Sequence, residues 1–395
     1  RYQSDRNGRK TPPLSTNGRI FLQGLDRMIA MDQYNGSILW SLETPHFRRF
    51  NMPRDCGNWC ADDDFVYATV RDKCWKIDAA TGEVVNAIDV PGNDSEPRND
   101  FGFVARHKSL LIGSSVRPGN LWIDFWGKAA WYDGTEGVVA AKVCSDKLFA
   151  VDPATGDKTW ELQRSPIVNA TIAINDDYLF FVESPNSADA ETRRLDGDSF
   201  WNGQRLVAVN ASTGEVEWDV ELDIEPGKVA FYGTVTNERI VLVSSNDKQY
   251  HVYAFDSKTG AKLWAQSTAW GKGKADHGSH LSRPAIVGNQ LFVRPAIFDL
   301  ATGTPSELRI PVGGCGTYAA TDSALFFRGG SGNNSAMFNT QRGDYTMWDR
   351  IRPDCWLSTI PAGGMLLSPE GGGGCSCGKW METSFGFIPK VLLQE

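Results

Sequence analysis

The sequence predicts an all-β protein assembled from a repeated, four-stranded antiparallel unit. Glycine is frequent, with 40 in 395 residues, and there are 14 tryptophans, which is typical of a chain rich in turns and strands. Two motifs recur along the chain, and each has the order short strand, turn, short strand. They return roughly every 40 to 50 residues, the period of a β-propeller blade. We therefore expect one eight-bladed β-propeller domain spanning residues 1–395.

The first motif is a tight turn between two strands. An Asp or Asn at its start can accept hydrogen bonds from the amides that follow, and a Gly near its end can take a left-handed conformation. In the fuller copies a Trp stands four residues after the Gly, where its ring can pack against a neighbouring repeat. The copies are AMDQYNGSILW (30–40), KIDAATGEVV (76–85), AVDPATGDKTW (150–160), AVNASTGEVEW (208–218), AFDSKTGAKLW (254–264) and a weaker IFDLATGTPSEL (297–308).

The second motif is a polar turn followed by bulky residues, as in TNGRIFL, NDDYLFF and TDSALFF. It predicts the hairpin between the first and second strands of a blade, and its eight copies give the expected number of blades. The first bulky residues are Ile20, Phe65, Leu110, Tyr178, Ile240, Leu291, Leu325 and Met365. The expected blades are approximately 12–47, 56–92, 100–163, 166–222, 228–267, 279–311, 313–345 and 354–395.

Charge and cysteine content narrow the class of protein. The net charge is -8 and no block of Lys and Arg stands out, so neither nucleic acid nor an anionic membrane surface is an expected partner. No apolar run is long enough for a transmembrane segment. The chain opens at Arg1 without a signal-like segment, which indicates a removed leader or a trimmed chain. Eight cysteines suit an oxidising compartment, so we expect a secreted or periplasmic protein.

The turn motif A-x-D-x-x-T-G-x-x-x-W resembles the tryptophan-docking repeat of the PQQ-type quinoproteins, which are eight-bladed β-propellers. This resemblance covers nearly the whole chain. It implies the fold more strongly than the activity, because the family contains PQQ dehydrogenases and also cofactor-free scaffold proteins of the outer-membrane assembly type. The last third of the chain is similar to PQQ-like repeat proteins of planctomycete-type bacteria.

Blade geometry assigns residues to two faces. The first strand of a blade starts at the top face, and the loop between its second and third strands returns there. Two long insertions, 114–146 and 184–204, are such loops, so the top is the candidate binding face for a ligand or a protein partner. The acidic run at 62–64 and His107 fall in bottom turns, where we expect them to be solvated.

The cysteines are predicted at the top, where disulfides are the favoured interpretation. Cys355 can pair with Cys375 or Cys377, and Cys74 with Cys56 or Cys60; the sequence does not fix the connectivity, and Cys144 and Cys315 stay open. The spacings 56–60 and 375–377 do not fit a structural zinc knuckle. Cys375 and Cys377 cannot both pair with Cys355, so at least one of them needs another partner. A metal site therefore stays an alternative interpretation.

A second candidate is the pair His277 and His280, whose spacing can place two imidazoles on one metal ion or supply a general acid or base. Two hydrogen-bonded loop histidines are the alternative. Arginines near the same rim suit an anionic or carboxylate ligand such as a uronic acid, a quinone carboxylate or a phosphate, and surface ion pairs are the alternative. Arg283 joins the histidines as a catalytic candidate, with His280 as the favoured base. The predicted ligand-binding residues are Arg54, Trp59, Arg328, Arg352 and Trp356.

These observations favour an extracytoplasmic, PQQ-like propeller that binds a small anionic or sugar-like ligand in a central funnel. Any chemistry there would be redox first and eliminative, as in polysaccharide lyases, second. One alternative is a non-catalytic scaffold for protein partners within a larger assembly. Another is a PQQ-dependent dehydrogenase, which is less favoured because the sequence lacks the adjacent-cysteine pair of that group. No cofactor is identified beyond a possible metal ion at the histidine pair.

Overall fold

The protein is almost entirely β-structure in a computed structural model. The described helical turns are two short ones, η1 (Asn169–Thr171) and η2 (Asp198–Phe200). No helix within the described residues is long and apolar enough to cross a membrane. The all-β prediction is thus confirmed. The structure describes residues 12–24, 26–45, 47, 57–121, 142–185, 198–246, 248–271, 283–313, 318–329, 334–349, 359–368 and 385–388.

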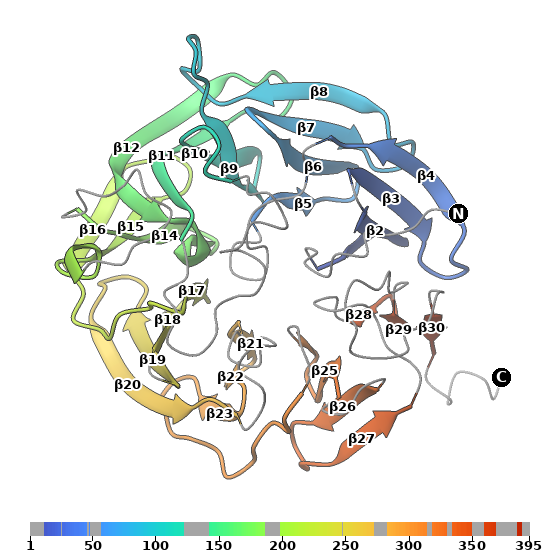
Figure 1. The fold of residues 1–395 in the computed structure, drawn as a ribbon, viewed down its shortest axis with the longest axis vertical. Coiled ribbons are helices and arrows are strands. Elements are labelled where there is room, and N and C mark those ends of the chain that lie inside the picture. The colour runs from blue at the N-terminus through green and yellow to red at the C-terminus, as the bar shows by residue number, and fades with distance from the viewer. Residues whose placement is uncertain are drawn as a thin grey trace. The chain divides into compact units, whose positions relative to one another are not determined.

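The chain groups into two compact units, and the first contains both ends of the sequence. Its described strands form antiparallel sheets of three or four strands (Figure 1). Within this unit β21 contacts β24 and β24 contacts β28, as inner strands of successive propeller blades do. The sheets are β1 (Leu14–Thr16), β2 (Arg19–Gly24), β3 (Arg27–Asp32), β4 (Ile38–Glu43); β21 (Ala285–Val287), β22 (Gln290–Val293), β23 (Ala296–Asp299); β24 (Ala319–Ala320), β25 (Ala324–Arg328), β26 (Ser335–Asn339), β27 (Tyr345–Trp348); and β28 (Ile360–Ala362), β29 (Met365–Ser368), β30 (Phe385–Phe387).

The second unit contains two four-stranded sheets and one eight-stranded sheet. Its inner strands also meet, since β5 contacts β9 and β13 contacts β17. The strands are β5 (Trp59–Ala61), β6 (Phe65–Val70), β7 (Lys73–Asp78), β8 (Val84–Asp89); β9 (Asp100–His107), β10 (Leu110–Val116), β11 (Cys144–Val151), β12 (Lys158–Val168), β13 (Ala173–Ile174), β14 (Tyr178–Glu183), β15 (Arg205–Asn210), β16 (Val216–Glu221); and β17 (Ala230–Val235), β18 (Arg239–Asn246), β19 (Gln249–Asp256), β20 (Lys262–Ala269).

All eight hairpins that the second motif predicts are present as antiparallel pairs. Each begins at an inner strand and turns within a few residues into the strand that carries the bulky side chains. Those side chains are mostly buried, as for Ile20, Leu291 and Leu325. The pairs are β1–β2, β5–β6, β9–β10, β13–β14, β17–β18, β21–β22, β24–β25 and β28–β29.

The first motif also forms the turn that its residues predict. The carboxylate of Asp256 accepts hydrogen bonds from the amides of Lys258 and Thr259, at 3.0 and 2.9 Å. Gly260 closes the turn at φ +72°, a conformation that a residue with a side chain adopts only at a cost. Its amide donates back to the Asp256 carbonyl at 2.9 Å. The same turn recurs at 32–36, 152–156, 210–214, 299–303 and 339–343.

Tryptophan rings lie on the turns of neighbouring repeats, as predicted. Trp160 covers Gly214, and its indole Nε1 donates to the Ala211 carbonyl at 3.1 Å. Trp218 stands in the same relation to Gly260, and its Nε1 donates to Ser257 at 3.2 Å. The glycine is required for this contact, because a Cβ on Gly214 would come within 2.8 Å of the Trp160 ring.

The eight-stranded sheet arises because β12 does not stop where the third blade is expected to end. It runs on to Val168 and pairs Ile167 with Glu183 of β14. Arg164 crosses the junction and binds both Glu183 oxygens, with the shorter contact at 2.6 Å, and Asp219 of β16 at 2.7 Å. Asp219 also accepts from Arg205 of β15, so one ionic network ties four strands together.

Candidate functional site

Three of the eight predicted rim residues fall in the described part of the chain. Arg283 and Arg328 lie in the first unit and Trp59 in the second. Trp59 begins β5 and is 4% exposed, so its ring packs inside the unit and does not offer an open stacking surface. The other five, Arg54, His277, His280, Arg352 and Trp356, lie outside the described residues.

In the first unit, two strands end in arginine at the same position of the repeat. Arg294 follows β22 and Arg328 ends β25, in the segments LFVR and LFFR. Both strands start at the hairpin turn, so both arginines lie at the far end of their sheets, next to the loop between the second and third strands. Arg283 precedes β21 and therefore starts at this same end. We call Arg283, Arg294 and Arg328 the arginine cluster.

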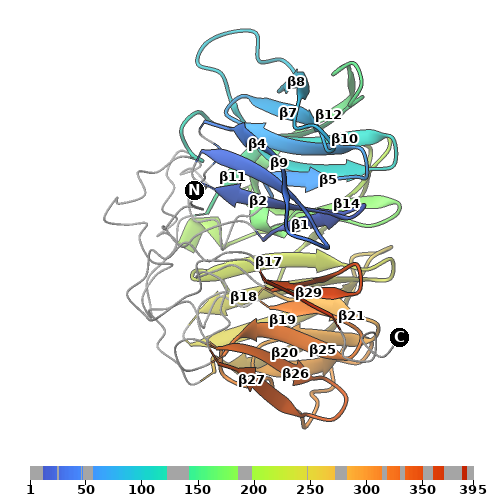
Figure 2. The same ribbon diagram turned by 90° about the vertical axis from the view of Figure 1, so that its right-hand side faces the viewer.

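Contacts link the chain segments that carry these three arginines. The hydroxyl of Tyr318 lies 2.8 Å from the Arg283 carbonyl and 2.6 Å from the Phe292 carbonyl. The guanidinium of Arg294 lies 5.8 Å from the centre of the Phe327 ring, which precedes Arg328. Figures 1 and 2 show β25 beside β26 and β27 in this part of the first unit.

A glycine makes room for the second arginine. A side chain on Gly313 would collide with Nη1 of Arg294, and its Cβ would lie 2.8 Å from the Arg328 carbonyl. Gly313 also forms an antiparallel bridge with Gly329. The buried backbone of residues 313 and 329 therefore lines the space beside Arg294.

The two strand-end arginines are unusually buried for charged side chains. Arg294 is 3% and Arg328 8% exposed. Burial of a charge is unfavourable unless hydrogen bonds and counter-charges compensate it. A guanidinium held on an aromatic ring presents a fixed fork of donors, which matches carboxylate and phosphate oxygens.

Sequence reasoning found Arg283 and Arg328 but missed Arg294. The missed signal is the repeat itself, because Arg294 and Arg328 each follow three bulky residues at equivalent positions of the second motif. An alignment of the copies of that motif, extended to the residue after the three bulky ones, identifies both Arg294 and Arg328.

The second unit contains a neutral polar cluster near the two insertions. Ser145 at the start of β11 lies 2.8 Å from the Ser114 hydroxyl and 2.5 Å from Oδ1 of Asn169. Nδ2 of Asn169 is buried and has no hydrogen-bond partner. Gly102 faces it, and a Cβ there would lie 3.2 Å from Nδ2. With no titratable member, this cluster can fix the strand ends but cannot act as an acid or base.

The bottom-turn residues serve the fold. Asp62 accepts from the amides of Asp64 and Phe65 and pairs with Arg106 at 3.1 Å. His107 was expected in the equivalent turn but is the last residue of β9, just before that turn. It is 7% exposed and not solvated, and burial lowers the pKa of its imidazole. Within the described residues, no group of three or more His, Cys, Asp or Glu side chains is arranged so that it could bind a metal ion.

The predicted disulfide between Cys60 and Cys74 is wrong. Cys60 of β5 is opposite Tyr67, and Cys74 of β7 is opposite Thr69, with the whole of β6 between them. Strands two places apart are separated by about 10 Å, beyond the Cα distance that a disulfide can bridge. Cys60 also lies near the bottom turn and not at the top. Cys144 opens β11, and Cys56, Cys315, Cys355, Cys375 and Cys377 lie outside the described residues.

Cys60 should be an unreactive thiol. Burial raises its pKa to about 12, although the nearby Arg106 opposes the shift. Because the thiolate is the nucleophile, we expect iodoacetamide at pH 8 to alkylate Cys60 at least ~100-fold more slowly in the native than in the unfolded protein. Mass spectrometry of the Cys60 peptide measures both rates, and equal rates would contradict the placement of Cys60 in β5.

The described residues do not supply a recognisable holder for PQQ. The sequence has no adjacent cysteines, and the described donor set contains no group that fits the cofactor's metal ion.

Comparison with known proteins identifies the repeat. Residues 145–306 match the family model described as outer membrane protein assembly factor BamB. The dehydrogenase subunit of a quinone alcohol dehydrogenase from Komagataeibacter europaeus is 29% identical over 232 residues, which cover 50% of this chain and 28% of that protein. The chain thus spans little more than a quarter of the length of this curated relative.

Two solved structures share the fold along most of this chain. Quinohemoprotein alcohol dehydrogenase from Comamonas testosteroni has a TM-score of 0.62 at 12% identity, covering 98% of this chain and 76% of its own. BamB from Moraxella catarrhalis has a TM-score of 0.54 at 11% identity, covering 94% of this chain and 96% of its own. The docking turns and the family-model match identify PQQ-like repeats in residues 145–306, and the structural alignments show that the chain shares the β-propeller fold.

Proposed function

We propose that this chain is an eight-bladed, extracytoplasmic PQQ-like propeller that binds an anionic ligand at the arginine cluster. The observation that carries the proposal is the burial of Arg294 and Arg328 at equivalent ends of neighbouring sheets, 3% and 8% exposed. The eight hairpins support the blade number. The outer-membrane assembly factor named by the family-model match supports the compartment.

The chemistry of the cluster favours a carboxylate or phosphate group. A guanidinium forms two parallel hydrogen bonds with either group, and a low-dielectric surrounding strengthens them. Phe327 and Gly313 restrict the movement of Arg294, so less conformational freedom is lost when a ligand binds. A sugar acid such as a uronic acid combines this charge with the hydroxyl groups expected of a carbohydrate-like ligand.

Anion binding can be tested by calorimetric titration with glucuronate, with glucose as the neutral control and inorganic phosphate as a second anion. We expect glucuronate to bind and glucose not to bind. Arg294→Leu should weaken glucuronate binding roughly ten- to a hundredfold, because a hydrogen bond to a charged group contributes about 1.5–3 kcal/mol. Arg294→Lys should retain part of the affinity.

The matched control is Arg342→Leu, which removes an arginine that is 71% exposed in the same unit and pairs with Asp344. This variant should bind glucuronate as the unchanged protein does. The proposal fails if neither anion binds the unchanged protein, or if the Arg294 and Arg342 variants lose the same affinity.

A second candidate is a scaffold that binds protein partners. It is favoured by one observation: residues 145–306 match the family model described as outer membrane protein assembly factor BamB. The partner surface would be formed by insertions 114–146 and 184–204. Replacing only the middle of each insertion, residues 122–141 and 186–197, by a short Gly-Ser linker should then abolish partner binding and leave glucuronate binding unchanged.

Catalysis at His277 and His280 stays a prediction, with Arg283 beside them in the sequence. Elemental analysis of the purified protein tests the metal version. A stoichiometric transition metal that His277→Ala and His280→Ala both remove would support it, and a metal that survives both substitutions would contradict it.

A further inference from the structure

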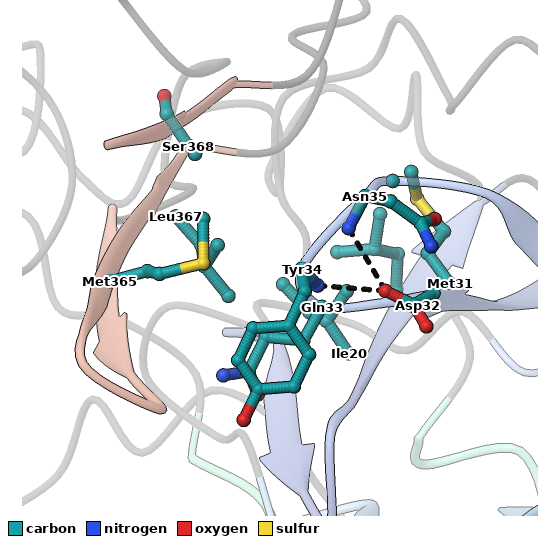
Figure 3. Close-up of a pocket in the computed structure, with 12 residues that line it drawn as sticks. Ile20, Met31, Asp32, Gln33, Tyr34, Asn35, Met365, Leu367 and Ser368 are labelled. Atoms are coloured by element: carbon teal, nitrogen blue, oxygen red, sulfur yellow. Dashed lines mark hydrogen bonds between the residues drawn. The ribbon is translucent and has the colours of Figure 1, made fainter. Parts of the chain in front are cut away.

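Titratable side chains at several turns of this protein are held by hydrogen bonds from the turn itself. Figure 3 shows this for Asp32, whose carboxylate accepts from the amides of Tyr34 and Asn35 at 2.8 and 2.9 Å. His107, the last residue of β9, differs. It is 7% exposed, and its Nε2 is buried without a hydrogen-bond partner among the described residues. Such a group is uncommon, because buried polar atoms are almost always paired in folded proteins.

His107 lies where two neighbouring hairpins meet, β9–β10 and β13–β14. Alternate residues of a strand point to the same face, so His107 shares a face of β9 with Phe103. The Phe103 ring packs against a cluster that includes Leu179 of β14. Just after His107, Nζ of Lys108 lies 4.0 Å from Oδ1 of Asp177, in the turn before β14. The imidazole is therefore placed at the contact between the two turns.

The charged groups that act on this imidazole are Lys108, Asp176 and Asp177. Arg106 points to the opposite face of β9 and pairs there with Asp62 at 3.1 Å. Burial lowers the pKa of the imidazole and the Lys108 ammonium lowers it further, whereas the two carboxylates oppose these effects. The balance favours the neutral form of the ring.

A protonated imidazole would have no counter-ion of its own at this contact. Asp177 already pairs with Lys108, and Asp176 accepts from Nδ2 of Asn237 at 2.6 Å. A buried cation without its own partner is unfavourable. Protonation therefore favours a movement that exposes the ring to water.

The turn between β13 and β14 is also bound on its other side. There, Nδ2 of Asn175 donates to the Thr236 carbonyl in the turn between β17 and β18, at 3.2 Å. These contacts do not involve the imidazole, so the movement should occur on the side of His107. We propose that His107 is an acid-sensitive switch, which lets β9–β10 and β13–β14 pack together while its ring is neutral and separates their turns when it is protonated.

The sign of the pH effect follows from the burial. The folded-state pKa of His107 lies below the ordinary value of about 6.5 that applies to the unfolded chain. The contact is therefore at full strength above pH 6.5 and weakens as the pH falls towards the folded-state value. His107 belongs to the second unit and the arginine cluster to the first, so this inference goes beyond anion binding and does not depend on it.

Hydrogen–deuterium exchange of the full chain at pH 7.5 and 5.5 tests the switch, with rates corrected for intrinsic exchange. We expect residues 103–111 and 173–180 to exchange at least ~2-fold faster at pH 5.5. His107→Gln should remove this difference, because its side chain gains no proton in this range. Thermal unfolding at pH 7.5 shows whether each variant is folded.

Two substitutions at the neighbouring ion pair give opposite expectations. Lys108→Met removes a positive charge and should make the response to acid smaller. Asp177→Asn removes a negative charge and should make it larger. Both break the same pair, so loss of that pair cannot by itself explain changes of opposite sign.

The matched control is His251→Gln in the same unit. His251 lies 2.8 Å from Oδ1 of Asn246 and 3.1 Å from the Ser267 hydroxyl, and this variant should keep the full response to acid. The proposal is overturned if the unchanged protein exchanges equally at both pH values, if His107→Gln responds as the unchanged protein does, or if the Lys108 and Asp177 variants shift the response in the same direction. None of these results bears on glucuronate binding, so failure here is distinct from failure at the arginine cluster.

Discussion

Replacing Trp160 by alanine should lower the free energy of unfolding by about 3–5 kcal/mol, the usual range for truncating a buried tryptophan. The side chain is 6% exposed and packs with Leu148, Leu179 and Val207. Its loss opens a cavity over Gly214 and leaves the Ala211 carbonyl without its indole donor. Chemical denaturation followed by circular dichroism measures the change.

The partner glycine gives a sharper version of this test. Gly214→Ala should destabilise the unchanged protein, because its Cβ would lie 2.8 Å from the Trp160 ring and φ is +76°. When Trp160 is already alanine, the part of the stability loss that comes from the clash with the ring should disappear. The cost of holding alanine at a positive φ, about 1 kcal/mol, should remain. Strictly additive losses would contradict direct packing of the ring on the turn.

Val216→Ala is the matched control for the tryptophan. It shortens a side chain that is 41% exposed on β16 of the same sheet. The expected loss is within about 0.5 kcal/mol, as for most surface substitutions. A loss comparable with that of Trp160→Ala would mean that shortening any side chain of this sheet is destabilising, and that the docking turns have no special role.

The local elements of this fold could be predicted from the sequence because their causes are local. The Asx turn at Asp256, its glycine at 260 and the hairpins all depend on residues within a few positions of one another. The tryptophan contact was also predictable, since the repeat supplies both the ring and the turn on which it packs. These turn and hairpin motifs are sufficient to predict the all-β class and to identify the repeat.

What the sequence did not predict depends on strand register and on distant partners. Cys60 and Cys74 are close along the chain, yet the intervening β6 separates them. The ionic network of Arg164 joins strands whose residues are up to 55 positions apart. Arg294 was missed because a single arginine after a strand has no meaning until the copies of the repeat are compared.

Replacing Arg164 by methionine should destabilise the protein by about 3–5 kcal/mol at neutral pH, as when one partner of a buried ion pair is removed. The Glu183 side chain is 4% exposed and would keep its charge without the guanidinium that now binds both its oxygens. Asp219 would still have Arg205. Lys158→Met is the control, since it breaks only an exposed pair with Glu161, worth about 0–1 kcal/mol.

The effect of Arg164→Met should depend on pH in a defined direction. Burial raises the pKa of Glu183 above its ordinary value, and Arg164 opposes that shift, so removing Arg164 raises the pKa further. A carboxyl with a raised folded-state pKa favours folding below its unfolded-state pKa and loses this contribution as the pH rises through the folded value. The destabilisation should therefore be largest at pH 7–8 and shrink towards about pH 4.5, where Glu183 becomes protonated in both states.

Denaturation midpoints at pH 7.5 and 5.0 test this pH dependence. The double variant Arg164→Met with Glu183→Leu should recover much of the lost stability at both pH values, because it leaves no unpaired charge in the sheet. A loss that is independent of pH, or that the double variant does not relieve, would mean that Arg164 acts through packing and not through its charge.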